Sequence, residues 1–166
     1  MTILTSGLKQ VMLPTCNSFY KVLTNQSNTY TKNTPFDFRF AFLEELNFET
    51  NQWEVALCDI QLSRPAGVTF EASLWVYCDI VEETQVGDKK ETLLRCISTT
   101  STRGATFYMT FLDKTYLSIR RTSIREVAIS IKGLQQKKTT QYTDNSAQIK
   151  RQLPTTATLH FRRRNG

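Results

Sequence analysis

Between Pro35 and Leu43, every second residue is a phenylalanine. The alternating set is Phe36, Phe38, Phe40 and Phe42, and the residues between its members are Asp37, Arg39 and Ala41. Only an extended strand places alternate side chains on the same side of the backbone. The segment is therefore predicted to be a half-buried β-strand.

The same period of two recurs in short segments along the chain. Further strands are predicted at residues 19–23, 53–62, 73–81, 91–97, 106–112, 127–131 and 156–161. Residues 83–90 are predicted to be a hairpin connection with Gly87 and Asp88 at its tip. Residues 43–48 are predicted to hold one turn of helix at most. About eight short strands predict an all-β protein, and that number favours a single jelly-roll β-sandwich of antiparallel strands.

A chain of 166 residues is predicted to form one domain, 1–166. We expect a flexible N-terminus, a polar basic loop around 134–155 and a basic C-terminal tail at 162–166. No run reaches the roughly 18 apolar residues of a membrane span, and the first residues do not have the pattern of a signal peptide. The protein is therefore predicted to be made inside the cell and not secreted, which gives the glycosylation sequon at Asn25 little weight.

Positive charge is concentrated in the C-terminal third of the chain. Residues 1–113 contain nine Lys and Arg against thirteen Asp and Glu, a net of −4, whereas residues 114–166 contain twelve against two, a net of +10. This asymmetry predicts an acidic partner such as packaged DNA, bound by non-specific electrostatics, or else a loop and terminus that charge keeps soluble. The possible nucleic-acid contacts are Arg162, Arg163, Arg164, Lys150 and Arg151.

The sequence offers little for catalysis. His160 is the only histidine, whereas a metal site in a β-sandwich usually needs two or three imidazoles. The six glycines form no phosphate-binding loop, nucleophile elbow or dinucleotide motif. We therefore predict that the protein is not an enzyme and has no catalytic residue, cofactor or metal. His160 is predicted to be a surface or edge residue, on the strand face opposite Leu159 and Phe161.

Polar and sulfur-containing side chains within the apolar strands have structural interpretations. Asp59 and Asp79 are predicted to pair with Arg39 or Arg95, because a charge in such a place needs a partner. The wide spacing of the four cysteines argues against a zinc site or a small disulfide scaffold. Three of them are predicted to be small buried hydrophobic residues: Cys58, Cys78 and Cys96.

Three segments resemble blocks of one protein family. Residues 51–60, NQWEVALCDI, are similar to the G-x-WEV-(G/A)-L-x-x-I segment of the penton, or minor capsid, proteins of Polinton/Maverick elements and adintoviruses. Residues 74–81, LWVYCDIV, followed by VGD at 86–88 and LLR at 93–95, resemble that family's YVYCDIVEPQxVGDxxxxLLR block. The closing segment TLHFR at 158–162 resembles the family's terminal strand. Order and spacing match over about residues 36 to 164.

The resemblance implies a structural virion protein: a single jelly roll that forms homopentamers at the fivefold vertices of an icosahedral capsid, beside a double jelly-roll major capsid protein. Two features depart from the family, namely a longer and more basic segment at 134–155 and the absence of proline in the VEPQ position. A ring of five needs two different patches on each subunit. Trp75 and Tyr77 are a possible subunit interface, or else core residues between the sheets.

Two other functions remain open from the residues. The chain could be a nucleic-acid-contacting capsid or accessory protein that uses its basic C-terminal third. It could instead be a lectin-like β-sandwich that binds a ligand with the loops at one end of its sheets.

Overall fold

A computed structural model describes residues 11–12, 17–48, 52–63, 73–99, 106–135, 138–141 and 153–164. These residues contain thirteen strands and no helix, so the all-β prediction is confirmed. The eight strands at or near the predicted positions are β2 (Ser18–Thr24), β3 (Asp37–Asn47), β4 (Trp53–Ser63), β5 (Ser73–Cys78), β8 (Leu93–Ser98), β9 (Thr106–Thr110), β11 (Ser123–Gln135) and β13 (Thr155–Arg163). The shorter strands are β1 (Val11–Met12), β6 (Thr84–Val86), β7 (Lys89–Glu91), β10 (Leu117–Ser118) and β12 (Lys138–Gln141).

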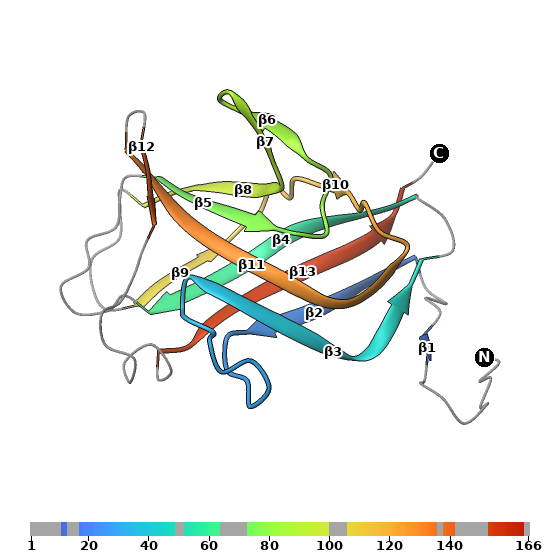
Figure 1. Ribbon diagram of the computed structural model, residues 1–166. Helices are drawn as coiled ribbons and strands as arrows, with labels where there is room; N and C mark the ends of the chain where they lie inside the picture. Colours follow the sequence, from blue (N-terminus) through green and yellow to red (C-terminus); the bar gives the residue numbers. More distant parts are fainter. Residues whose placement is uncertain are drawn as a thin grey trace.

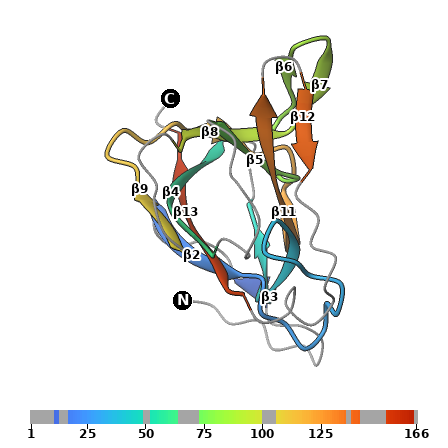
Figure 2. The ribbon, with the colours of Figure 1, turned by 90° about the vertical axis from the view of Figure 1, so that its left-hand side faces the viewer.

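The strands form two main sheets that face each other as two layers (Figures 1 and 2). In the first, called the β3 sheet, the order is β3-β11-β5-β8, with β1 beside β3 and β12 paired to the end of β11. In the second, called the β4 sheet, the order is β2-β13-β4, and both β9 and β10 pair with the remaining edge of β4. Among the strands that the structure describes, every pairing is antiparallel except that of β1 with β3.

The core fills the space between the two sheets. In β13, for example, Ala157, Leu159 and Phe161 point inward and are completely buried, whereas the intervening residues point outward. At one end four aromatic rings pack together, with the rings of Phe19 and Phe161 5.0 Å apart and those of Phe48 and Trp53 5.1 Å apart. Burying each large apolar side chain contributes about 1.5–3 kcal/mol, so this interior is the main source of stability.

Several predicted boundaries need correction. Residues 43–48 are not a helical turn: β3 continues to Asn47, because β11 pairs with it at Ser123 and Ile124 after an irregularity in register. The predicted loop at 134–155 begins inside a hairpin, since β11 runs to Gln135 and β12 pairs back onto it. The predicted tail at 162–166 begins within β13.

One turn has the conformation that its glycine predicts. Gly87 joins β6 to β7 with a φ of 64°, in the left-handed region that glycine adopts without strain. Asp88 completes this tip, as expected. The other expectations on flexible segments, for residues 1–10 and 13–16 and for 142–152, lie outside the described residues.

Candidate functional site

Two of the three terminal arginines are held by one carboxylate on the outer face of the β4 sheet, the face turned away from the β3 sheet. Arg162 lies opposite Glu54 in the β13–β4 register, and its Nε lies 2.6 Å from a Glu54 carboxylate oxygen. The Arg162 guanidinium also stacks 3.3 Å from the centre of the Tyr116 ring. Arg164 pairs with the other Glu54 oxygen at 3.7 Å and donates a hydrogen bond to the Ser118 hydroxyl.

This cluster accounts for part of the predicted nucleic-acid surface. The side chains of Arg162 and Arg164 remain 45% and 51% exposed, but Glu54 neutralises one of their two charges. Arg163 points its guanidinium toward the Trp53 ring, at 5.5 Å from its centre. Lys150 and Arg151 lie outside the described residues. All three terminal arginines therefore have intramolecular contacts: Arg162 and Arg164 with Glu54, and Arg163 with the Trp53 ring.

His160 lies beside this cluster and is neither a surface nor an edge residue, contrary to the prediction. It belongs to β13, which has a strand on each side, and only 8% of it is exposed. Its Nδ1 lies 2.7 Å from the Tyr116 hydroxyl, and its ring stacks on the Tyr20 ring with centres 4.4 Å apart. Burial, together with the charges of Lys114 and Arg162, lowers the pKa of His160.

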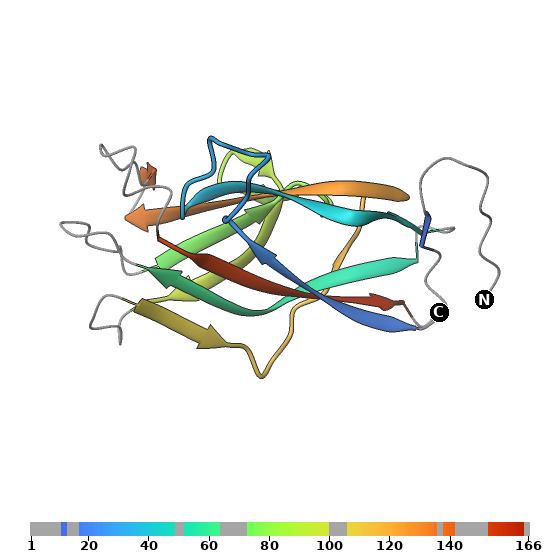
Figure 3. The same cartoon turned by 90° about the horizontal axis from the view of Figure 1, so that it is seen from below.

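The cover over His160 comes from a segment that the sequence did not single out. Residues 111–116 connect β9 to β10 and pass outside the β4 sheet, as Figure 3 shows from below. Phe111 fixes the start of this segment by donating its amide to the Cys58 carbonyl at 2.8 Å. The segment then places the Lys114 ammonium 5.6 Å from the centre of the Tyr20 ring and the Tyr116 ring over Arg162.

The same outer face exposes most of the large apolar side chains that the described part of the chain leaves in water. They are Tyr20 at 57% exposure, Val22 at 61%, Tyr108 at 63% and Leu112 at 95%, while Leu43 is exposed on β3. This set was not singled out from the sequence. The available signal was the alternation in residues 18–24, where Tyr20 and Val22 oppose the inward Phe19 and Leu23.

Trp75 and Tyr77 lie on the outer face of the β3 sheet, because Leu74, Val76 and Cys78 take the inward positions of β5. They are therefore not core residues between the sheets, which was the alternative interpretation. Tyr77 is nevertheless only 8% exposed, and the Lys132 ammonium lies 5.0 Å from the centre of its ring. Burial and a hydrogen bond with Glu91 raise the pKa of Tyr77 far above its ordinary value. Trp75 is partly exposed.

The ion pairs predicted for the two strand aspartates, Asp59 and Asp79, are not among the ion pairs of the described residues. Asp79 lies 3.7 Å from Arg121 and accepts a hydrogen bond from the Ala128 amide at 2.9 Å. Arg39 pairs instead with Glu126 at 3.0 Å, and Arg95 donates to the Asp113 carbonyl. These partners are between 18 and 87 residues away in the sequence, so spacing along the chain could not reveal them.

The cysteine prediction is correct for two residues and wrong for one. Cys58 and Cys78 are buried, but Cys96 is exposed on β8. Burial raises the pKa of the Cys78 thiol to about 12, which leaves it protonated and unreactive at neutral pH. Among the described residues no group of three or more His, Cys, Asp and Glu is placed to hold a metal ion.

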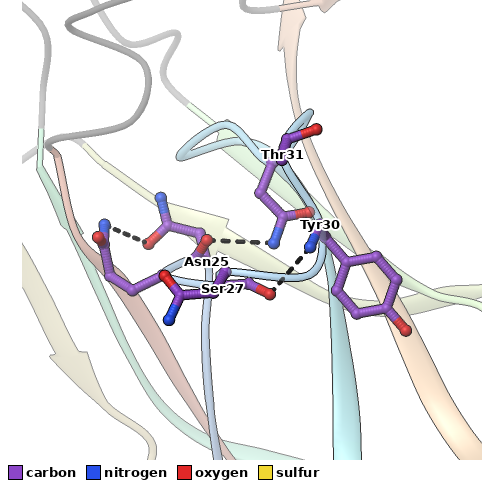
Figure 4. A pocket seen from close by; sticks show the side chains of 7 residues that line it. Asn25, Ser27, Tyr30 and Thr31 are labelled. Atoms are coloured by element: carbon purple, nitrogen blue, oxygen red, sulfur yellow. Dashed lines mark hydrogen bonds between the residues drawn. The ribbon is translucent and has the colours of Figure 1, made fainter.

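A hollow at the opposite end of β13 is lined by the connection between β2 and β3. Its lining residues are Asn25, Gln26, Ser27, Asn28, Tyr30, Thr31 and Asn33. Figure 4 shows this loop and its internal hydrogen bonds, in which the Ser27 hydroxyl accepts the Tyr30 amide and the Asn25 carbonyl accepts the Asn33 side chain. Asn25 is 4% exposed and hydrogen-bonds through both ends of its amide, so the folded chain does not present this sequon for glycosylation.

Comparisons of the chain with models of protein families, with curated proteins and with solved structures gave no match. In the parts of the chain that the structure describes, no helix is long and apolar enough to cross a membrane.

Proposed function

We propose that this chain is a structural virion protein: a penton, or minor capsid, protein that folds as a single jelly roll and forms homopentamers at the fivefold vertices of an icosahedral capsid. Its neighbours there are double jelly-roll major capsid proteins. The protein acts by shape and contact rather than by catalysis.

The order of the strands is the observation that carries this proposal. The eight positions along the chain are β2, β3, β4, β5, β8, the pair β9 and β10, β11 and β13. Numbered in that order, the β4 sheet reads 1-8-3-6 and the β3 sheet reads 2-7-4-5. Each sheet thus interleaves early and late strands, and this order supports the proposal of a jelly roll, in which two Greek keys are wound together.

The resembling blocks fall on strands of both sheets. Residues 51–60 lie largely in β4, residues 74–81 begin in β5 and residues 158–162 lie in β13. Their inward residues, such as Val55, Leu74 and Leu159, are completely buried. The resemblance therefore supports a shared fold most directly, and the fivefold assembly follows from it through the family.

A ring of five subunits requires two different surfaces on each copy, because a fivefold contact is head to tail. The outer face of the β4 sheet supplies exposed Tyr20, Val22 and Tyr108 beside a cluster of arginines. The outer face of the β3 sheet supplies Leu43 and the partly exposed Trp75. Tyrosine, tryptophan and arginine are enriched at protein interfaces, which makes these two faces the pair that we assign to the ring.

The DNA-contacting alternative has less support. Arg162 and Arg164 share a carboxylate, and Arg162 is also stacked on Tyr116. A phosphate would have to compete with Glu54 for both guanidinium groups. Sequence-independent DNA binding that weakens with added salt would favour this alternative.

The mass of the purified protein in solution tests the proposal. Light scattering on a sizing column is expected to give five times the 19.1 kDa chain. Val22→Glu places a charge on the exposed β4 face and should reduce the mass to that of a monomer without unfolding the chain, whereas the exposed Lys89→Glu should leave the pentamer intact. A dimer or trimer would contradict the proposal, and a monomer would confine assembly to the capsid itself.

A further inference from the structure

The buried His160 lies under a connection that is itself mostly in water. This connection, residues 111–116 between β9 and β10, is called the covering segment. Its residues 112–115 are all exposed, whereas His160 is buried. The covering segment therefore shields a titratable ring while it buries little of its own surface.

Few contacts hold the covering segment against the β4 sheet. At its start the Phe111 amide donates to the Cys58 carbonyl at 2.8 Å. At its end the Tyr116 hydroxyl lies 2.7 Å from His160 Nδ1, and the Tyr116 ring stacks on the Arg162 guanidinium. Tyr116 thus connects the covering segment directly to the imidazole beneath it.

The charges that act on His160 are positive. Burial is the largest cause that lowers the pKa of His160, and the charges of Lys114 on the covering segment and Arg162 on β13 lower it further. The Glu54 carboxylate at this end of β4 is already paired with Arg162 and Arg164. A proton added to the imidazole is therefore placed beside cations and away from water.

The other titratable side chains against the His160 ring are phenols and a thiol, which titrate above neutral pH. Tyr20 on β2 stacks on the ring with centres 4.4 Å apart. The Cys58 thiol on β4 lies beside the His160 backbone, and burial raises its pKa. Asp113, the acidic residue of the covering segment, is exposed, and its carbonyl accepts a hydrogen bond from Arg95. Between about pH 5 and 7, His160 is therefore the group in this cluster whose charge changes.

We propose that the covering segment is a pH-sensitive cover, released from the outer face of the β4 sheet when His160 takes up a proton. While the segment is in place, an imidazolium is held away from water and close to the Lys114 charge. When the segment detaches, water reaches the ring and Lys114 moves away from it. The detached form therefore binds the proton more tightly, and acid shifts the equilibrium toward that form.

The linkage to one proton sets the direction and the size of the effect. The closed cover is favoured above about pH 6.5, the ordinary pKa of histidine, and this preference is lost as the pH falls toward the lower pKa of the covered ring. The ratio of detached to closed forms can rise at most about tenfold for each pH unit, because a single proton is bound. Release of the segment is independent of the proposed function; only an acid-induced loosening of the ring contact on this face would rest on it.

Hydrogen exchange on the full-length protein, measured by mass spectrometry, tests the inference. The reporters are peptides that span residues 111–119, in which the Phe111 and Ile119 amides are bonded to carbonyls of β4. The comparison is the region of Ile131, whose amide is bonded in the β3 sheet. Exchange is expressed as protection factors, which removes the direct effect of pH on the chemical rate. Between about pH 7 and about pH 5, protection at 111–119 should fall at least about threefold, and protection at Ile131 should stay constant.

Variants separate the charge of His160 from its packing. His160→Gln removes the titration and should give equal protection at both pH values. Lys114→Gln keeps His160 but removes a neighbouring cation, so the pKa of His160 should rise and the acid-induced loss of protection should shrink at least about twofold. Lys89→Gln, at an exposed lysine on β7, is the matched control and should behave like the parent. Because His160 is the only histidine, its NMR signal reports the titration directly.

Unchanged protection at 111–119 between the two pH values would overturn the inference. A loss of the same size at Ile131, or one that persists in His160→Gln, would do the same. Light scattering on the same samples reports the assembly separately, so failure of the cover and failure of the pentamer are distinguishable.

Discussion

The two ends of β13 are fastened by different kinds of interaction. At Thr155 the strand meets the β2–β3 loop through uncharged hydrogen bonds, in which the Asn25 amide replaces a strand partner for the Thr155 and Leu153 backbone. At Arg162 it meets β4 and the β9–β10 connection through an ion pair with Glu54 and a stacked Tyr116 ring. The first end is buried and the second is about half exposed at its arginines.

The difference shows which interactions fix the conformation of this protein. When a buried side-chain amide is removed, the backbone groups that it satisfied are left without a partner in an interior without water. The cost in free energy is larger than the net contribution of the hydrogen bond itself. An ion pair at a half-exposed guanidinium contributes little to stability, because water solvates the guanidinium when the pair is broken. We therefore expect substitutions at the uncharged end to lower the free energy of unfolding more than substitutions at the charged end, although the charged residues are more conspicuous in the sequence.

The largest effect is expected for Asn25→Ala. This change leaves the Thr155 amide and the Leu153 carbonyl without partners, and each unsatisfied group costs about 1–3 kcal/mol, so the free energy of unfolding should fall by about 3 kcal/mol. Chemical denaturation measures it. Asn28→Ala, in the same loop but exposed, is the control and should stay within about 0.5 kcal/mol of the parent. Equal losses in the two variants would contradict the special role of Asn25.

Removing the ion pair at the charged end should lower the free energy of unfolding by a smaller amount. Glu54→Gln keeps a hydrogen-bonding group beside Arg162 but removes the charge, and we expect a loss of about 1 kcal/mol in the free energy of unfolding. Glu83→Gln is the matched control, because Glu83 is 49% exposed and lies 3.8 Å from Arg120, so its loss should be close to zero. A Glu54 effect as large as that of Asn25 would overturn the ranking of the two ends.

Lowering the pH should destabilise the folded protein through the charged end of β13 alone. Since the pKa of folded His160 lies below the 6.5 of an unfolded chain, the unfolded state binds more protons between those two values. Stability should therefore be constant above pH 6.5 and fall as the pH drops from 6.5 toward the folded pKa. Urea titrations between about pH 5 and 8 measure this slope. Because His160 is the only histidine, His160→Gln should abolish the slope; a slope that survives the substitution has another origin.

The smallest expected effect is that of salt. Raising the ionic strength from about 0.1 M to about 1 M shortens the screening length from about 10 Å to about 3 Å. The loss caused by Glu54→Gln should then shrink by a few tenths of a kcal/mol, whereas the loss caused by Asn25→Ala should not change. Repeating the two denaturation series at both salt concentrations makes the comparison. If the losses caused by Glu54→Gln and Asn25→Ala depended equally on salt, the two ends of β13 would not be held by different kinds of interaction.

The sequence was informative about what depends on neighbours along the chain. The alternation of phenylalanine from Phe36 to Phe42 predicted β3, and Gly87 predicted the tip of a hairpin. It was less informative about the ends of strands: β3 reaches Asn47 because β11 pairs with it there, and that pairing joins residues about 76 positions apart, such as Asn47 and Ser123. Local pattern cannot report a partner at that distance.

At the candidate site, too, the sequence showed the local features but not the partners that come from distant parts of the chain. The three terminal arginines were visible in the sequence, but Glu54 and Tyr116, which hold Arg162, come from β4 and from the connection before β10. His160 looked like an exposed residue because its face of the strand alternates away from Leu159 and Phe161. It is buried because a separate segment, residues 111–116, crosses that outer face.

By itself, the sequence determined the strands and the side chains that fill the space between two sheets, because a period of two is a local property of an extended backbone. Only the tertiary structure decided which outward residues meet: Glu54 with Arg162, Tyr116 with His160, and Asn25 with Thr155. These contacts depend on which strands become neighbours and in what register, and those choices are set by the packing of the whole core.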